Sequence, residues 1–174
     1  DKVLPILLYS YQRLRDTRLQ KCFLCCSMFS EDHVIRRVEL IELLIAEQVM
    51  HQRDSRKVEF DQSHMIINKL VNLCLLEIVS SSFGEEIWGV KMHDLVREMA
   101  IEITRDKPKY MIKAGLHLDK MPDEEKWTLN LEKISLMHNK IAEIPEGSSP
   151  NCPRLSTLIL SDNPLIRIHN SFFA

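Results

Sequence analysis

The stretch LEKISLMHNKIAEI, at residues 131–144, returns 24 residues later as LSTLILSDNPLIRI, at residues 155–168. The two stretches share apolar residues at the same offsets and one Asn near the middle. The shared positions are Leu131, Ile134, Leu136, Asn139, Ile141 and Ile144 in the first stretch and Leu155, Leu158, Leu160, Asn163, Leu165 and Ile168 in the second. Similarity at a fixed period predicts a repeat architecture in which neighbouring repeats share one core.

This spacing fits the leucine-rich template L-x-x-L-x-L-x-x-N-x-L and predicts the start of an α/β solenoid. Each Asn side chain should satisfy backbone groups where the strand turns away from the core. A stable solenoid needs about three repeats or more, so we expect further repeats after Ala174. Strand residues that point away from the core form a candidate protein-binding face: Lys133, Ser135, Met137, Thr157, Ile159 and Ser161. The alternative is that these early repeats only dock against the rest of the protein.

The residues before the repeats have a helical period. Apolar residues spaced by three and four predict helices at about 4–14, 18–29, 38–49 and 60–75, with a charged loop at 53–59. An alternating pattern over 76–92, with a turn at 80–86, predicts a β-hairpin. A last amphipathic helix is predicted at 94–105, with Arg97 on its outward face. The predicted fold class is therefore mainly α with small β: a winged-helix domain of helices plus a β-hairpin wing, followed by the start of the solenoid.

Four segments of this chain, taken in order, resemble one protein family. They read LYSYQRL at 8–14, CFLCCSMFSED at 22–32, LIELLIAE at 40–47 and VKMHDLVREMA at 90–100. Together with the repeats they resemble plant disease-resistance receptors of the coiled-coil, nucleotide-binding, leucine-rich-repeat class. The resemblance implies a winged-helix domain of the nucleotide switch at residues 1–115 and the first leucine-rich repeats at 116–174. The chain departs from the family pattern at Cys25, Ser30 and residues 48–50, where Tyr, Pro and Gly-Phe-Ile are usual.

The Met-His-Asp signature of that family corresponds to Met92, His93 and Asp94. The resemblance implies that His93 contacts the β-phosphate of bound ADP, with Asp94 and Met92 in support, and so latches the resting state. The position is physically suitable, because the free N–H groups and the dipole at a helix N-terminus favour an anion. We expect Asp94 to be the N-cap of the helix. An isolated Met-His-Asp tripeptide would be read instead as a surface His beside an ordinary cap.

The implied cofactors are ADP and ATP, with Mg²⁺, bound mainly by a nucleotide-binding domain upstream of this chain. The chain has four glycines and no G-x-x-x-x-G-K-[ST] phosphate loop. We therefore expect that this segment is not an enzyme, and that the whole receptor is a switch with at most weak ATPase activity. In this interpretation, exchange of ADP for ATP releases the latch and triggers defence signalling.

The formal net charge of −2 excludes a strong global attraction to nucleic acid or to an anionic membrane. The expected partners are the upstream nucleotide-binding domain, the downstream repeats, a pathogen effector or guarded host protein, and other copies of the activated receptor. One alternative is a winged-helix DNA-binding protein, but the third predicted helix carries Glu39, Glu42 and Glu47 and no basic residue from 38 to 50. Another is a leucine-rich-repeat adaptor without nucleotide switching.

Five cysteines in no regular framework do not resemble a disulfide-stapled secreted domain. No signal peptide or apolar membrane span is present, so we expect a cytoplasmic protein, with any peripheral attachment to the plasma membrane made by other parts of the receptor. Cys22, Cys25 and Cys26 lie on one helix without a second ligand pair. We therefore interpret them as small buried hydrophobic residues and predict no metal site.

Overall fold

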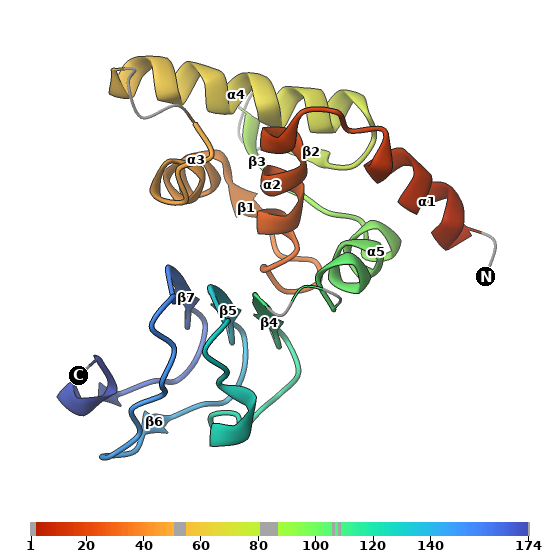
Figure 1. Cartoon of the computed structure of the whole chain (residues 1–174). Coiled ribbons are helices and arrows are strands. Elements are labelled where there is room, and N and C mark those ends of the chain that lie inside the picture. Colours follow the sequence, from red (N-terminus) through yellow and green to blue (C-terminus); the bar gives the residue numbers. More distant parts are fainter. Residues whose placement is uncertain (1–2, 51–54, 81–86, 106, 108, 174) are drawn as a thin grey trace. The chain divides into compact units, whose positions relative to one another are not determined.

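The computed structural model describes residues 3–50, 55–80, 87–105, 107 and 109–173. The chain divides into two compact units, Asp1–Ile103 and Thr104–Ala174, and each is described by itself (Figure 1). The domain boundary that we predicted after residue 115 falls inside the second unit, because strand β4 (Tyr110–Ile112) pairs with a strand of the repeats.

The first unit contains the five predicted helices. They are α1 (Val3–Gln12), α2 (Thr17–Cys26), α3 (Arg37–Ala46), α4 (Arg56–Asn72) and α5 (Asp94–Arg105). Asp16 caps α2 by accepting a hydrogen bond from the amide of Arg18 at 2.9 Å. The predicted charged loop is wrong over residues 56–59, which form the first turn of α4 behind the N-cap residue Ser55. Its other part, at 53–54, lies outside the described residues.

A three-stranded antiparallel sheet completes this unit, in the order β1-β3-β2. The strands are β1 (Ile35–Arg36), β2 (Glu77–Ser80) and β3 (Ile87–Lys91). Strands β2 and β3 confirm the predicted hairpin, whereas residues 81–86 of its turn, with Gly84, lie outside the described residues. Gly89 faces β1 so closely that a Cβ atom there would lie 2.5 Å from the carbonyl oxygen of Ile35, so this position requires glycine.

The core of the first unit lies between α2, α3 and α4, which contact one another in pairs. Figure 1 shows the long helix α4 crossing above the two shorter ones, with α3 seen almost end-on. Every residue from Cys22 to Ser30 is buried. The aliphatic side chains of Leu40, Leu44 and Leu70 are completely buried against them. Within the described part of the chain, no helix combines the length and apolarity needed to cross a membrane.

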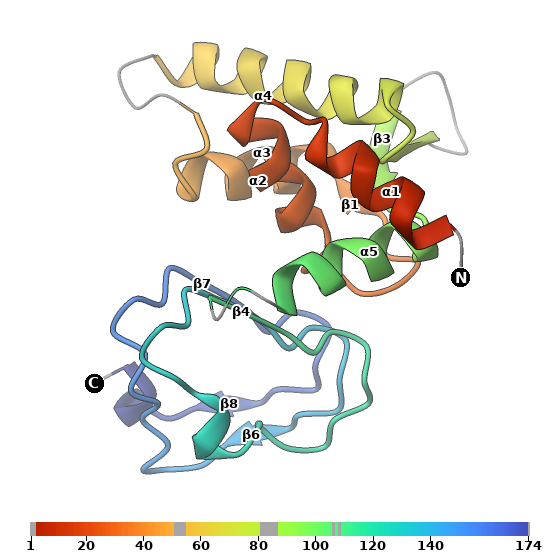
Figure 2. The same ribbon diagram turned by 45° about the vertical axis from the view of Figure 1, so that its right-hand side comes forward.

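The second unit consists of short strands in two parallel sheets, which Figures 1 and 2 show from two sides. One sheet has the order β4-β5-β7, with β5 at Lys133–Ser135 and β7 at Thr157–Ile159. The other pairs β6 (Glu143–Ile144) with β8 (Arg167–Ile168). Two short 3-10 helices, η1 (Glu124–Lys126) and η2 (Asn170–Phe173), accompany them. Residues of the two similar sequence stretches therefore stand side by side, as Lys133 does with Thr157.

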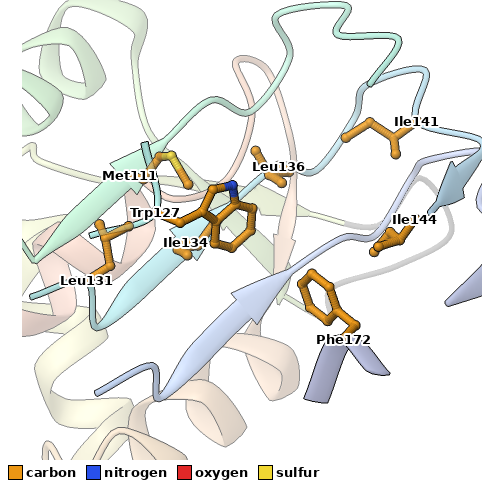
Figure 3. Close-up of a cluster of buried hydrophobic side chains, with 8 residues drawn as sticks. All are labelled: Met111, Trp127, Leu131, Ile134, Leu136, Ile141, Ile144 and Phe172. Atoms are coloured by element: carbon orange, nitrogen blue, oxygen red, sulfur yellow. The ribbon is translucent and has the colours of Figure 1, made fainter. Parts of the chain in front are cut away.

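The apolar positions of the first stretch form the centre of the second unit's core (Figure 3). The buried cluster comprises Met111, Trp127, Leu131, Ile134, Leu136, Ile141, Ile144 and Phe172. The rings of Trp127 and Phe172 meet edge to face with centroids 6.1 Å apart, and the Trp127 indole N–H donates to the carbonyl oxygen of Pro122 at 2.9 Å. The indole is thus buried without an unpaired donor.

Asn139 and Asn163 have the predicted role in the turns that follow β5 and β7. The amide of Leu118 donates to Asn139 Oδ1 at 2.9 Å, and Asn139 Nδ2 donates to the carbonyl oxygen of Leu136 at 2.8 Å. Asn163 does the same with the amide of Ile141 at 3.1 Å and with the carbonyl oxygen of Leu160 at 2.9 Å. Each Asn therefore joins its own turn to the turn before it.

Candidate functional site

His93 lies in the short connection between strand β3 and helix α5. Its neighbour Met92 is only 6% exposed and anchors this connection in the core, whereas His93 itself is exposed. The amide of Arg97 donates to the carbonyl oxygen of His93 at 2.9 Å, which is the first hydrogen bond of α5. His93 is therefore the N-cap residue. Our prediction that Asp94 is the N-cap is wrong, because Asp94 is already the first residue of the helix.

The imidazole of His93 takes part in capping the helix. The amide of Leu95 donates to His93 Nδ1 at 3.4 Å, a long hydrogen bond that satisfies one of the free N–H groups of the first turn. Because Nδ1 accepts here, the proton of the neutral ring belongs on Nε2. Asp94 is exposed beside it, with its carboxylate at the positive end of the helix dipole. The site therefore offers an outward ring N–H donor next to a helix N-terminus.

A hollow of about 460 Å³ borders His93. Its wall is mostly apolar and comes from the end of α4, the connection from α4 to β2, β2 itself and the first turn of α5; it includes Leu76, Ile78 and Val96. Cys74 also lines the hollow and has a left-handed backbone conformation, with φ of 57°, where the chain leaves α4. The imidazole thus stands at the edge of an apolar depression in the surface of the first unit.

Arg97 is a component of this site that sequence reasoning placed on the outward face of the helix. The structure shows its side chain half-buried, with Nε donating to the carbonyl oxygen of Phe29 at 2.7 Å. The pKa of Arg97 lies below its usual value, because burial lowers it by more than the carboxylates of Glu31 and Asp94 raise it. The sequence contained one indication that Arg97 lies near His93: it follows His93 by four residues, which is about one helical turn on the same face.

The predicted protein-binding positions form a row within the second unit. Lys133 pairs with Thr157 and Ser135 pairs with Ile159, on either side of the core positions Ile134 and Leu158. Met137 and Ser161 lie two residues beyond the ends of the same two strands. Ser135 and Met137 are completely buried, contrary to the prediction, so only Lys133, Thr157, Ile159 and Ser161 offer surface to a partner. The Lys133 ammonium group also donates to the Ser156 hydroxyl at 3.4 Å. The parallel pairing brings these residues together, as the sequence pattern requires.

The three cysteines of α2 are at most 1% exposed, which confirms that Cys22, Cys25 and Cys26 are core residues. A hydrogen bond with Cys26, together with burial, raises the pKa of the Cys22 thiol well above its usual value. The Cys22 thiol is therefore protonated and unreactive in the folded protein. Among the residues that the structure describes, no three His, Cys, Asp or Glu side chains are grouped so that they could hold a metal ion.

The helices and the small antiparallel sheet of the first unit define a winged-helix domain, and comparison with known proteins gives the same class. Residues 28–100 match the family described as "Disease resistance protein Winged helix domain". Two similar relatives in Arabidopsis thaliana are disease resistance protein RPS5, 37% identical, and disease resistance protein SUMM2, 38% identical; each alignment covers 99% of this chain and 19% of the relative. The chain belongs to the disease resistance protein family, and it spans about a fifth of the length of these relatives.

Proposed function

We propose that this chain is part of an intracellular plant immune receptor and comprises the winged-helix part of its nucleotide switch and its first leucine-rich repeats. In this proposal His93 helps to hold the ADP-bound resting state. The observation that carries the proposal is the position of His93 in a member of the disease resistance family: an exposed imidazole at the N-cap of α5, with Nδ1 turned to the helix and Nε2 left to donate.

The residues present fit the phosphate end of a nucleoside diphosphate. His93 Nε2–H would donate to a phosphate oxygen, and the first-turn N–H groups of α5 would add the favourable field of a helix N-terminus. ADP would supply the negative charge that these donors stabilise. The remaining contacts belong to the nucleotide-binding domain, which we place upstream, with Mg²⁺ bound there. ADP that bridges two domains stabilises the closed arrangement, and ATP shifts the population towards the open one, because the two nucleotides contact the domains differently.

The second unit, in the same proposal, starts the leucine-rich-repeat solenoid. Two observations support this: the parallel strands repeat at the spacing of the sequence, and Asn139 and Asn163 make equivalent bonds. The members of the row that are not buried, Lys133, Thr157, Ile159 and Ser161, would then face a pathogen effector, a guarded host protein or the switch domains. Defence signalling would start from an oligomer of the activated receptor in the cytoplasm.

The decisive test is His93→Asn in the intact receptor. Asn is a good N-cap residue, so this change removes the imidazole and preserves the start of α5. Losing a hydrogen bond to a charged group costs about 1.5–3 kcal/mol, which is about ten- to a hundredfold in affinity. We therefore expect faster ADP dissociation, measured with a labelled nucleotide, and raised signalling without pathogen.

The matched control is His117→Asn, which changes an exposed His in the second unit. It should leave both ADP dissociation and resting signalling as they are. If His93→Asn retains ADP as well as the parent receptor does, His93 is not the latch and the proposal is wrong.

A further inference from the structure

The start of α5 is connected to the turn after α2 by one side chain. Arg97 Nε donates to the carbonyl oxygen of Phe29 at 2.7 Å, a charge-assisted hydrogen bond in a half-buried position. Glu31 in the same turn and Asp94 in the first turn of α5 both attract the guanidinium group. The two segments are more than 60 residues apart in the sequence, with a separation of 68 between the bonded residues.

The same residue also holds the backbone of His93. The amide of Arg97 donates to the carbonyl oxygen of His93 at 2.9 Å, so the two ends of Arg97 connect His93 with Phe29. Because His93 is exposed and its ring has only one long hydrogen bond to the helix, its direction depends on how firmly the first turn of α5 is held. Through its side chain, Arg97 binds this turn to Phe29, a residue outside the helix.

We propose that Arg97 is a positioning residue for His93: it fixes the first turn of α5 against the turn at 29–31 and so aims the imidazole at its ligand. This inference rests on the proposed function of His93. Arg97 touches no ligand in this scheme and acts only through the helix start.

The chemistry of Arg97 allows its two contributions to be separated. Gln carries a nitrogen donor at the same distance from the backbone as Arg Nε, so Arg97→Gln can keep the bond to Phe29 while it loses the attraction to Glu31 and Asp94. Lys keeps the charge but places its nitrogen one atom further out. Arg97→Met removes both contributions and keeps the aliphatic stem that packs in this position.

The experiment is a double-mutant cycle in the intact receptor, with the rate of dissociation of labelled ADP as the readout. Arg97→Met alone should accelerate ADP loss by about tenfold, which corresponds to an interaction energy within the usual range for coupled residues. In a receptor that already carries His93→Asn, the same change should alter the rate by less than about twofold. Arg97→Gln should retain ADP almost as well as the parent receptor does. Arg105→Met, at the far end of α5, should not change the rate of ADP dissociation.

Each outcome decides between the two ideas. If His93→Asn leaves ADP retention unchanged, the proposed function fails and this inference fails with it. If His93→Asn accelerates ADP loss but Arg97→Met does not, or if the two effects multiply in the double variant, only the positioning role of Arg97 is wrong. Should Arg97→Met fail to fold, as judged by thermal unfolding, Arg97→Lys takes its place in the cycle, and effects that multiply there overturn the inference equally.

Discussion

The two copies of the repeated stretch have the same hydrogen bonds but different burial. Asn139 and Asn163 join successive turns through equivalent atoms. The core position Leu136 is completely buried, whereas its counterpart Leu160 is only partly buried. Strand β5 lies between β4 and β7 in its sheet, and β7 has a partner in that sheet, among the described residues, on one side only. The pattern therefore sets the direction of each side chain, and the neighbouring strands set the depth of its burial.

The largest expected effect contrasts Leu136→Ala with Leu160→Ala. A buried Leu replaced by Ala typically costs about 2–5 kcal/mol, because apolar contacts are lost and a cavity remains. We expect Leu136→Ala to fall in this range and Leu160→Ala to cost less than half as much, since Leu160 is partly exposed. Urea-induced unfolding, compared at the transition midpoint, measures both. Equal losses of stability would show that the two copies are equally embedded and would remove the contrast.

A smaller effect is expected from Asn139→Ala and Asn163→Ala. Each change leaves one backbone amide without its acceptor, which costs about 1–3 kcal/mol where water cannot replace it. Asn139 is 6% exposed and Asn163 is half-buried, so the first change should destabilise more. Hydrogen exchange gives a local readout: Asn139→Ala should accelerate exchange at Leu118, and Asn163→Ala at Ile141. Unchanged protection of both amides would contradict the assigned bonds.

The smallest expected effect concerns Cys152, whose thiol donates to the carbonyl oxygen of Thr128 at 3.4 Å. Burial raises the pKa of Cys152, so less thiolate is present at neutral pH than in an unfolded chain. Iodoacetamide should therefore modify this residue slowly, and the pH at which the rate is half-maximal should lie above that of the urea-unfolded protein. Mass spectrometry of the modified peptide follows the reaction. Equal midpoints in the folded and the unfolded protein would mean that Cys152 is more open than its contacts indicate.

The sequence was sufficient for the long, strongly periodic elements and insufficient for short ones. The five helices, the hairpin and the two Asn residues were predicted because each rests on several residues in phase. Strand β1 was missed, since Ile35 and Arg36 are too few to alternate. Strand β4 was missed because no Asn follows it at the template spacing. The first turn of α4 was taken for a loop, because charged residues at a solvated helix start resemble one.

Two errors at the candidate site have a common physical cause. Residue types have average preferences, and both His93 and Arg97 depart from theirs. Asp is a preferred N-cap and His is not, so the cap was assigned to Asp94, one residue late. A charged residue on an amphipathic helix is expected to face water. A guanidinium group can nevertheless turn inward where a carbonyl oxygen, such as that of Phe29, accepts a hydrogen bond from it.

The hydrogen bonds of Asn139 and Asn163 have a consequence for how the number of repeats can change. Contacts between the two copies recur at a separation of 24 residues, as between Ser156 and Glu132 or Gly147 and Ser171. Recombination that removes or duplicates one whole period keeps every Asn opposite the amide that it serves. The two Asn residues lie 21 and 22 residues after the amides that they serve, so this bond accommodates a difference of one residue between repeats. Loss or gain of whole periods is therefore compatible with the fold.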